Sequence, residues 1–348
     1  MDTVLRGADT LRREVWRVVA RTRLGRRCAR DRSWRLAVLA SGHVAVALAL
    51  TVLAPLWLLL LAPLVLGVPH IVSDVRFLLV RPPRSLAAGA ALGLLVPLGL
   101  MTALRALSAA GGPSFPEAEP MLGMAAVALG ALLAQPRGAA AVLTAAGVVA
   151  LAALALARPR DVALWLGHAH NLIAVGLWVA WSKGALRRGP VALVVGLIAL
   201  GIAVIASGVL EPLTAAMSGF DAPLGRFDMG ALVDTLAPDL EPTLGLRLVL
   251  IYAFAQSMHY TLWLRLVPGT MAPSPAPQSF RRGVTALRAD LGRVGLAVAV
   301  GLSVLVPVVA IGDPVGTRAT YLALVLFHGW LELAVIAHLA LLAGRRPA

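Results

Sequence analysis

The chain has a single cysteine, Cys28, so no disulfide can form within it and no cysteine-based metal motif is present. It also lacks a glycine-rich nucleotide loop and a recognisable order of serine, histidine and aspartate for a hydrolase triad. Charged residues make up only 14% of its 348 residues, and the alternating pattern of a membrane β-barrel is absent. The length alone would suggest one or two soluble domains, but this composition argues against them.

Apolar residues are abundant: the chain is 59% hydrophobic, with a mean hydropathy of +0.85. Long apolar runs with short breaks predict an all-α, polytopic transmembrane helical bundle of about 8–10 spans. Many small residues and few aromatic ones suit close helix packing in lipid. Residues 36–348 are expected to form one transmembrane domain, with spans at roughly 36–54, 56–80, 85–108, 120–134, 138–157, 161–182, 189–211, 243–267, 292–311 and 317–342.

A net charge of +14 invites a nucleic-acid interpretation, which the position of the charges argues against. Eleven arginines lie between Arg6 and Arg35, while Leu11, Val15 and Val18 recur among them at helical spacing. This pattern predicts that residues 1–35 form a basic amphipathic arm that lies on the membrane surface and contacts anionic lipid. The alternative is a disordered basic tail.

The remaining basic residues predict the topology of the chain. Arginines and lysines gather in alternate connections and at the C-terminus, whereas the 212–242 segment carries five acids against Arg226. The positive-inside rule then places both termini and the proline-rich 268–291 loop in the cytoplasm, and 212–242 outside as a lid. We expect a multi-pass protein of a bacterial inner membrane, of unknown oligomeric state.

Buried ionisable residues are the most informative feature, because they are costly in lipid and mark functional sites. His70 with Asp74 and His328 with Glu332 are two i,i+4 pairs, each on one face of a helix. With His170 and His259, these residues lie roughly 13–26 Å below the outer ends of their spans, at a rise of about 1.5 Å per residue. Such pairs can build a metal site between helices, or they can be hydrogen bonds of helix packing.

The other histidines are harder to assign. His168 and His170 are two residues apart and point about 200° from one another on a regular helix, so one of them is expected to be a ligand and the other a supporting donor. Depth favours His170 as the ligand. Polar contact between helices is the alternative for both. The roles of His43 and His338 stay open, with His338 expected near the inner interface.

Imidazole and carboxylate ligands with open positions are the usual setting of non-haem iron and oxygen chemistry. We therefore predict a metal site, with iron (Fe²⁺) as the first choice and zinc, copper or haem as alternatives. The predicted metal ligands are His70, His168, His170, His259 and His328, and the predicted catalytic carboxylates are Asp74 and Glu332.

The order of these motifs resembles the Brp/Blh family of membrane β-carotene 15,15′-dioxygenases. Gly67-Val-Pro-His70 with Asp74 is similar to the family's first motif, and His328 with Glu332 is similar to its last. Phe254 to His259 is similar to a later helix, although Trp263 stands where the family has a second histidine. The resemblance implies a buried iron centre in a helical bundle.

These observations predict a membrane metal-dependent oxygenase or oxidoreductase that uses dioxygen and a lipid-soluble substrate such as a carotenoid. Two alternatives remain open. A proton-coupled transporter or channel would use the same histidines and carboxylates to carry protons. A haem-binding electron-transfer protein would use paired histidines as axial ligands.

Overall fold

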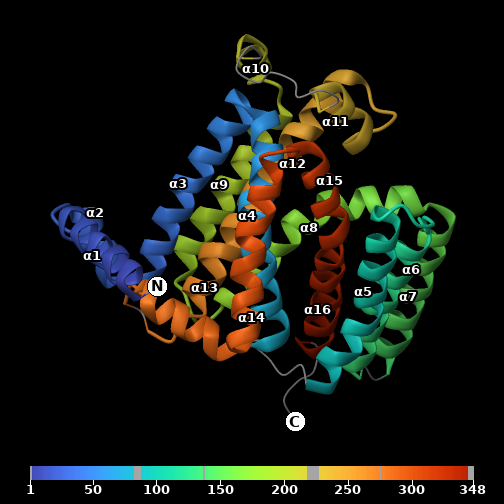
Figure 1. Cartoon of the computed structure of the whole chain (residues 1–348), viewed down its shortest axis with the longest axis horizontal. Coiled ribbons are helices and arrows are strands. Elements are labelled where there is room, and N and C mark those ends of the chain that lie inside the picture. The colour runs from blue at the N-terminus through green and yellow to red at the C-terminus, as the bar shows by residue number, and fades with distance from the viewer. Residues whose placement is uncertain (1, 82–87, 136–137, 218–226, 275, 344–348) are drawn as a thin grey trace. The chain divides into compact units, whose positions relative to one another are not determined.

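The computed structural model describes residues 2–81, 88–135, 138–217, 227–274 and 276–343 (Figure 1). The described residues form helices and connections, without any β-strand. The predicted all-α class is therefore confirmed for this part of the chain.

Six stretches are long and apolar enough to cross a membrane, which indicates an integral membrane protein. They are α3 (Arg32–Leu53), α4 (Pro55–Val75) continued by the π-helical turn η1 (Arg76–Val80), α8 (Pro159–Ser182), α9 (Arg188–Ala206), α14 (Phe280–Ala310), and α15 (Pro314–Val325) followed by α16 (Phe327–Ala343).

Helices coincide with all ten predicted spans, but only these six stretches qualify among the described residues. The predicted count of 8–10 would require further helices to cross as well. Those helices are α5 (Ala88–Ala109), α6 (Ala118–Leu133), α7 (Ala139–Ala157), and α12 (Pro242–Thr261) with its continuation η3 (Leu262–Leu266) and α13 (Val267–Thr270).

The chain divides into two compact units, and the first comprises residues 1–73 and 175–305. Helix α12 is its central element, because Leu250, Phe254, Met258 and neighbouring residues are buried on every side of the helix. A helix that is apolar all round is typical of a buried position. Helix α9 comes so close that a Cβ on Gly201 would lie 2.6 Å from the ring of Phe254.

The second unit comprises residues 74–174 and 306–348, and its closest packing joins α16 to α6. A Cβ on Gly123 would lie 2.1 Å from the indole of Trp330, and a Cβ on Gly130 would lie 2.3 Å from the carbonyl oxygen of Ala334. Small residues at such a crossing let two backbones approach in lipid. This packing positions α16, which carries His328 and Glu332.

Two predicted connections contain helices. The 212–242 segment includes α10 (Glu211–Ala216) and α11 (Met229–Leu236), while its residues 218–226 lie outside the described part. The prediction of a loop over 268–291 was wrong in its second half, because α14 begins at Phe280. Gly292, with φ of 72°, interrupts α14 where the predicted span was expected to begin.

The basic arm is helical, with α1 over Asp2–Val19 and α2 over Arg23–Arg30. The Asp9 carboxylate of α1 accepts hydrogen bonds from the backbone N–H groups of Phe280 (2.7 Å) and Arg281 (3.3 Å). Asp9 thereby caps the start of α14 from a point 271 residues earlier in the chain. This long-range cap explains why the local sequence did not predict the helix start.

Candidate metal site

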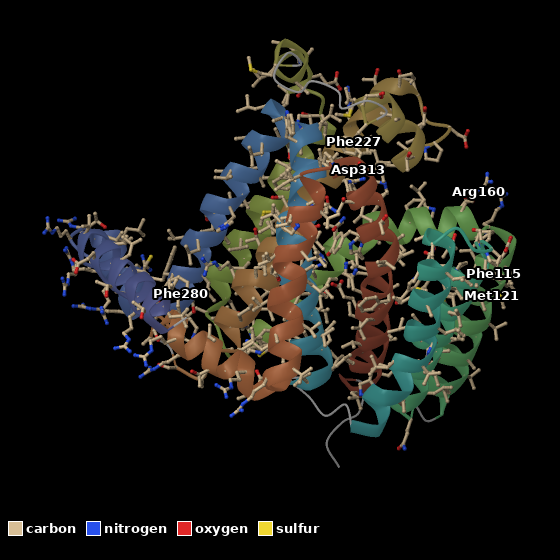
Figure 2. All side chains as sticks on the ribbon, viewed as in Figure 1. Phe115, Met121, Arg160, Phe227, Phe280 and Asp313 are labelled. Atoms are coloured by element: carbon tan, nitrogen blue, oxygen red, sulfur yellow. The ribbon has the colours of Figure 1, made fainter. Side chains whose placement is uncertain are left out.

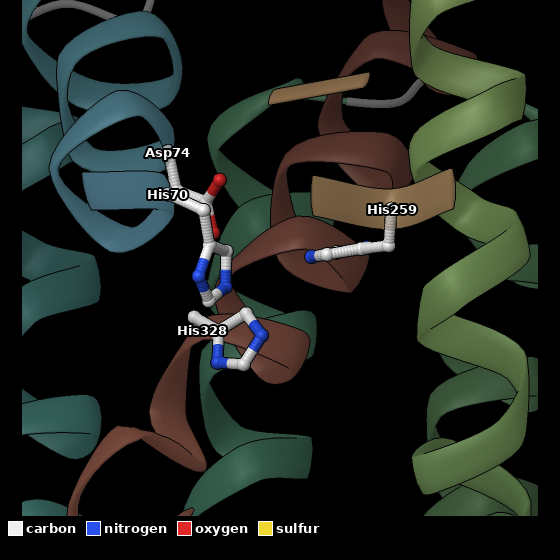
Figure 3. Close-up of side chains that lie close together, drawn as sticks. All are labelled: His70, Asp74, His259 and His328. Atoms are coloured by element: carbon white, nitrogen blue, oxygen red, sulfur yellow. The ribbon is translucent and has the colours of Figure 1, made fainter. Parts of the chain in front are cut away.

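Helix α4 presents His70 and Asp74 one turn apart, as their spacing predicted (Figure 3). Both side chains are buried, with His70 at 2% and Asp74 at 0% exposure. Between them, the hydroxyl of Ser73 donates a hydrogen bond of 2.5 Å to the backbone carbonyl of Trp263. That bond fixes this end of α4 against η3, the wide turn that follows α12.

Helix α12 contributes His259, which is also buried at 1% exposure. Its ring centroid lies 5.3 Å from that of His70, and the two planes meet at 77°. The ring of Tyr260 lies 4.7 Å from His70 and 6.0 Å from His259, so an aromatic wall borders the pair. The two imidazoles lie edge to face within one apolar environment.

Helix α16 carries His328 and Glu332 one turn apart, at 8% and 0% exposure. The Nδ1 atom of His328 lies 2.5 Å from the carbonyl oxygen of Val325. In the Nδ1–H tautomer it donates to that carbonyl, so Nε2 is the nitrogen that can bind a metal. A backbone partner of this kind commonly orients a metal-binding histidine.

Asp74 has an unusual environment for a carboxylate in an apolar bundle. Both of its oxygens are buried without a hydrogen-bond partner among the described residues. Its electrostatic neighbours include a second fully buried carboxyl group, Glu332, and the buried phenol of Tyr321. Two such carboxyl groups repel one another unless a cation or a proton compensates their charge.

Four of the buried residues form a group that can hold a metal ion. His70, Asp74, His259 and His328 each offer one ligand atom, and these atoms lie within 4.8 Å of one another (Figure 3). Three imidazole nitrogens with one carboxylate oxygen suit iron, zinc, copper or manganese better than magnesium or calcium. A set of four leaves coordination positions open on a metal that prefers five or six ligands.

The predicted pair on α8 is placed as helix periodicity requires, with the two histidines pointing different ways. The ring of His170 lies 5.2 Å from that of His328, and its Nδ1 lies 3.1 Å from the carbonyl oxygen of Leu166. His170 is therefore a neighbour of a candidate ligand. His168 is half-buried, and neither histidine belongs to the group of four.

The two unassigned histidines lie elsewhere. His43 is exposed on α3, with Nδ1 2.8 Å from the Leu39 carbonyl of its own helix. His338, expected near the inner membrane interface, is buried between helices, with Nδ1 3.1 Å from the carbonyl oxygen of Gly130. The close approach of α6 to α16 provides that acceptor, and a sequence read one helix at a time gives no sign of it.

Sequence reasoning passed over the tyrosines. The chain has only three, Tyr252, Tyr260 and Tyr321, and all are buried. The ring of Tyr260 lies tilted against His70, Tyr321 lies near Asp74, and the Tyr252 hydroxyl lies 3.4 Å from the amide nitrogen of Gln256. Their scarcity, together with their place in otherwise apolar helices, was the available signal, because a buried phenol needs a hydrogen-bond partner.

Comparisons with known proteins leave the site to be judged on its own chemistry. No protein-family model matches the chain. No curated protein and no solved structure was found to be similar to it.

Proposed function

We propose that the chain is an integral membrane oxidoreductase that holds a redox-active metal, iron first, at His70, Asp74, His259 and His328. The observation that carries this proposal is the buried group of three histidines and one carboxylate in an apolar helical protein. Burying these groups is costly, and a bound cation offsets that cost better than helix packing does.

The donor set also supports catalysis over a purely structural role. Structural metal sites are usually closed by four strong ligands in tetrahedral geometry, often with cysteine. Histidines with one carboxylate are typical of iron centres that keep positions open for dioxygen and substrate. When bound, such a metal would supply activation of dioxygen.

Each side chain then has a role that its environment supports. His70, His259 and His328 bind the metal through ring nitrogens, and Asp74 contributes an anionic oxygen. Glu332 adds a second negative charge near Asp74, which favours a bound cation, and His170 orients His328 by lying against its ring. Tyr260 excludes water beside His70.

The location of the group supports a lipid-soluble substrate. The four residues are buried among apolar helices, several of them long enough to cross a membrane, so we propose that the substrate enters laterally from the hydrocarbon phase. The similarity of the His70 and His328 motifs to those of membrane carotenoid dioxygenases agrees with a polyene or another long apolar molecule.

A proton relay is the second candidate, and one observation favours it. Asp74 and Glu332 form a buried carboxyl pair with Tyr321 near it, and a shared proton could compensate their charge as a metal would. Haem is the weaker alternative, since the close packing of His70, His259 and Tyr260 suits a compact ion better than a macrocycle.

Metal analysis of the purified protein distinguishes these candidates. The oxidoreductase predicts stoichiometric iron without a Soret band, lost in His70→Ala and in His259→Ala. His43→Ala is the matched control, because it removes an exposed imidazole whose Nδ1 contacts only its own helix. If the purified protein holds no metal and conducts protons in liposomes, the metal site is refuted in favour of the proton relay. A Soret band would instead show that the protein binds haem.

A further inference from the structure

A cavity of about 340 Å³ lies beside the basic arm, within the first unit. Side chains from α1, α3 and η3 line it, together with the segment that leads to α14. The arm closes one side, since Asp9 caps α14 and the Arg12 guanidinium donates a hydrogen bond of 3.4 Å to the Pro277 carbonyl. The cavity therefore exists only while the arm is packed against the start of α14.

The charge of the lining is of one sign. Arg12, Arg35 and Arg265 line the cavity, and no aspartate or glutamate is among its lining residues. Asp9 contacts Arg12 at 3.6 Å, and Arg35 donates to the Cys28 carbonyl at 2.9 Å, which fixes the positions of these two guanidinium groups. Three arginines around one space favour an anion that accepts several hydrogen bonds, such as a phosphate group.

The rest of the lining is apolar. Leu36, Leu39 and Leu264 line the cavity with the aromatic rings of Trp16 and Phe280. A freely soluble anion would gain nothing from contact with this apolar lining. An amphiphile, with a charged head and an apolar body, matches both parts of the lining.

A path for an acyl chain leads away from the cavity along α3. Leu39, Val46, Leu50 and Leu53 recur at helical spacing on that helix and are 41–58% exposed. Helix α3 is one of the six candidate spans, so this stripe would face hydrocarbon. A lipid with its head at the arginines could place one chain against the stripe.

The arm itself suits the headgroup layer. Leu11, Val15 and Val18 are exposed on one face of α1, among many arginines. Figure 2 shows nitrogen-tipped side chains gathered along α1 and the start of α14 near Phe280. A second basic cavity, lined by Arg6, Arg13, Arg281 and Arg282, flanks the arm on its α14 side.

We propose that the cavity is a specific binding site for the phosphate headgroup of an anionic phospholipid, held by Arg12, Arg35 and Arg265. This differs from general attraction of a basic arm to an anionic surface, because it assigns one lipid to one cavity. The bound lipid would join α1 to η3, the continuation of the helix that carries His259.

The test compares lipid binding to the full-length protein in detergent by native mass spectrometry. Dioleoyl phosphatidylglycerol should remain bound as one tightly held molecule, and dioleoyl phosphatidylcholine should not. Arg265→Gln should weaken that binding about tenfold, the order expected for one charge-assisted contact. Arg17→Gln is the matched control, because it removes one exposed charge of the same arm outside the cavity.

Arg12→Gln repeats the test from another helix, and Arg265→Lys should restore part of the affinity by keeping the charge. Equal losses in Arg17→Gln and Arg265→Gln would show only a diffuse basic surface and overturn the proposal. Equal retention of the two lipids would overturn it as well. Thermal stabilisation by glycerol 3-phosphate or inorganic phosphate alone, with the same dependence on Arg265, would assign the cavity to a soluble phosphate compound instead.

Discussion

Replacing Asp74 by Asn separates a metal-binding carboxylate from one that only holds helices together. Asp74 is fully buried, lacks hydrogen-bond partners among the described residues and interacts with buried Glu332. In the metal-free protein this carboxylate costs free energy, whether it stays charged or takes up a proton. The isosteric amide removes the negative charge and its repulsion by Glu332, while its own polar atoms stay buried, so Asp74→Asn should stabilise the metal-free protein by about 1 kcal/mol.

The metal-loaded protein should respond in the opposite way. At a free metal concentration about 100 times Kd, binding stabilises the native state by about 2.7 kcal/mol. Loss of a ligand or its orienting carboxylate weakens binding about 10–100-fold or more. At a 100-fold loss the same metal concentration contributes only about 0.4 kcal/mol. The stability gap between metal-loaded and chelated protein should therefore nearly vanish.

The assay is thermal unfolding in detergent with added iron and with a chelator, for the wild type and Asp74→Asn. Asp161→Asn is the control, since Asp161 is an exposed carboxylate on α8 paired with Arg158, and it should change neither measurement. If Asp74→Asn destabilises the chelated protein and leaves the gap unchanged, Asp74 is a packing group and the metal assignment fails.

Three further predictions concern the scaffold. Cysteines introduced at Ser274 and Asp234 should label from opposite sides of the membrane against a low background, because burial raises the pKa of the native Cys28 thiol; labelling from the same side would refute the topology. Asp9→Ala should cost about 1 kcal/mol of local stability by uncapping α14, seen as faster hydrogen exchange in α1 and the start of α14, whereas Glu14→Ala should not. Gly130→Ala should destabilise the protein by about 1–3 kcal/mol and loosen metal binding, because its Cβ would meet the Ala334 carbonyl. Gly147→Ala is the control, since its Cβ would meet no atom within 4 Å, and it should change neither thermal unfolding nor metal content.

The sequence was sufficient for features that one helix determines. His70 with Asp74 and His328 with Glu332 share helix faces because 3.6 residues per turn fix their directions. The apolar runs likewise predicted where the long helices lie. They did not show which of these helices are long enough to cross a membrane.

Features that depend on how helices rotate against one another were beyond the sequence. His170 is two residues from His168 and equally polar, yet only the orientation of α8 places it against His328. Tyr321 reaches Asp74 from another part of the chain, and His338 bonds to a carbonyl 208 residues away. No local pattern encodes these neighbours, since each arises from packing between helices.

The backbone beside the candidate ligands is irregular in a consistent way. The π-helical turn η1 begins at Arg76, two residues after Asp74, and η3 begins at Leu262, three residues after His259. A π-helical turn shifts the direction of the side chains that follow, and such turns occur frequently at functional sites. In η3 the carbonyl of Trp263 accepts a hydrogen bond from the hydroxyl of Ser73, which fixes α4 close to His259. Apolar packing alone does not require π-helical turns. Their position next to Asp74 and His259 therefore supports a site in which the directions of these side chains are important.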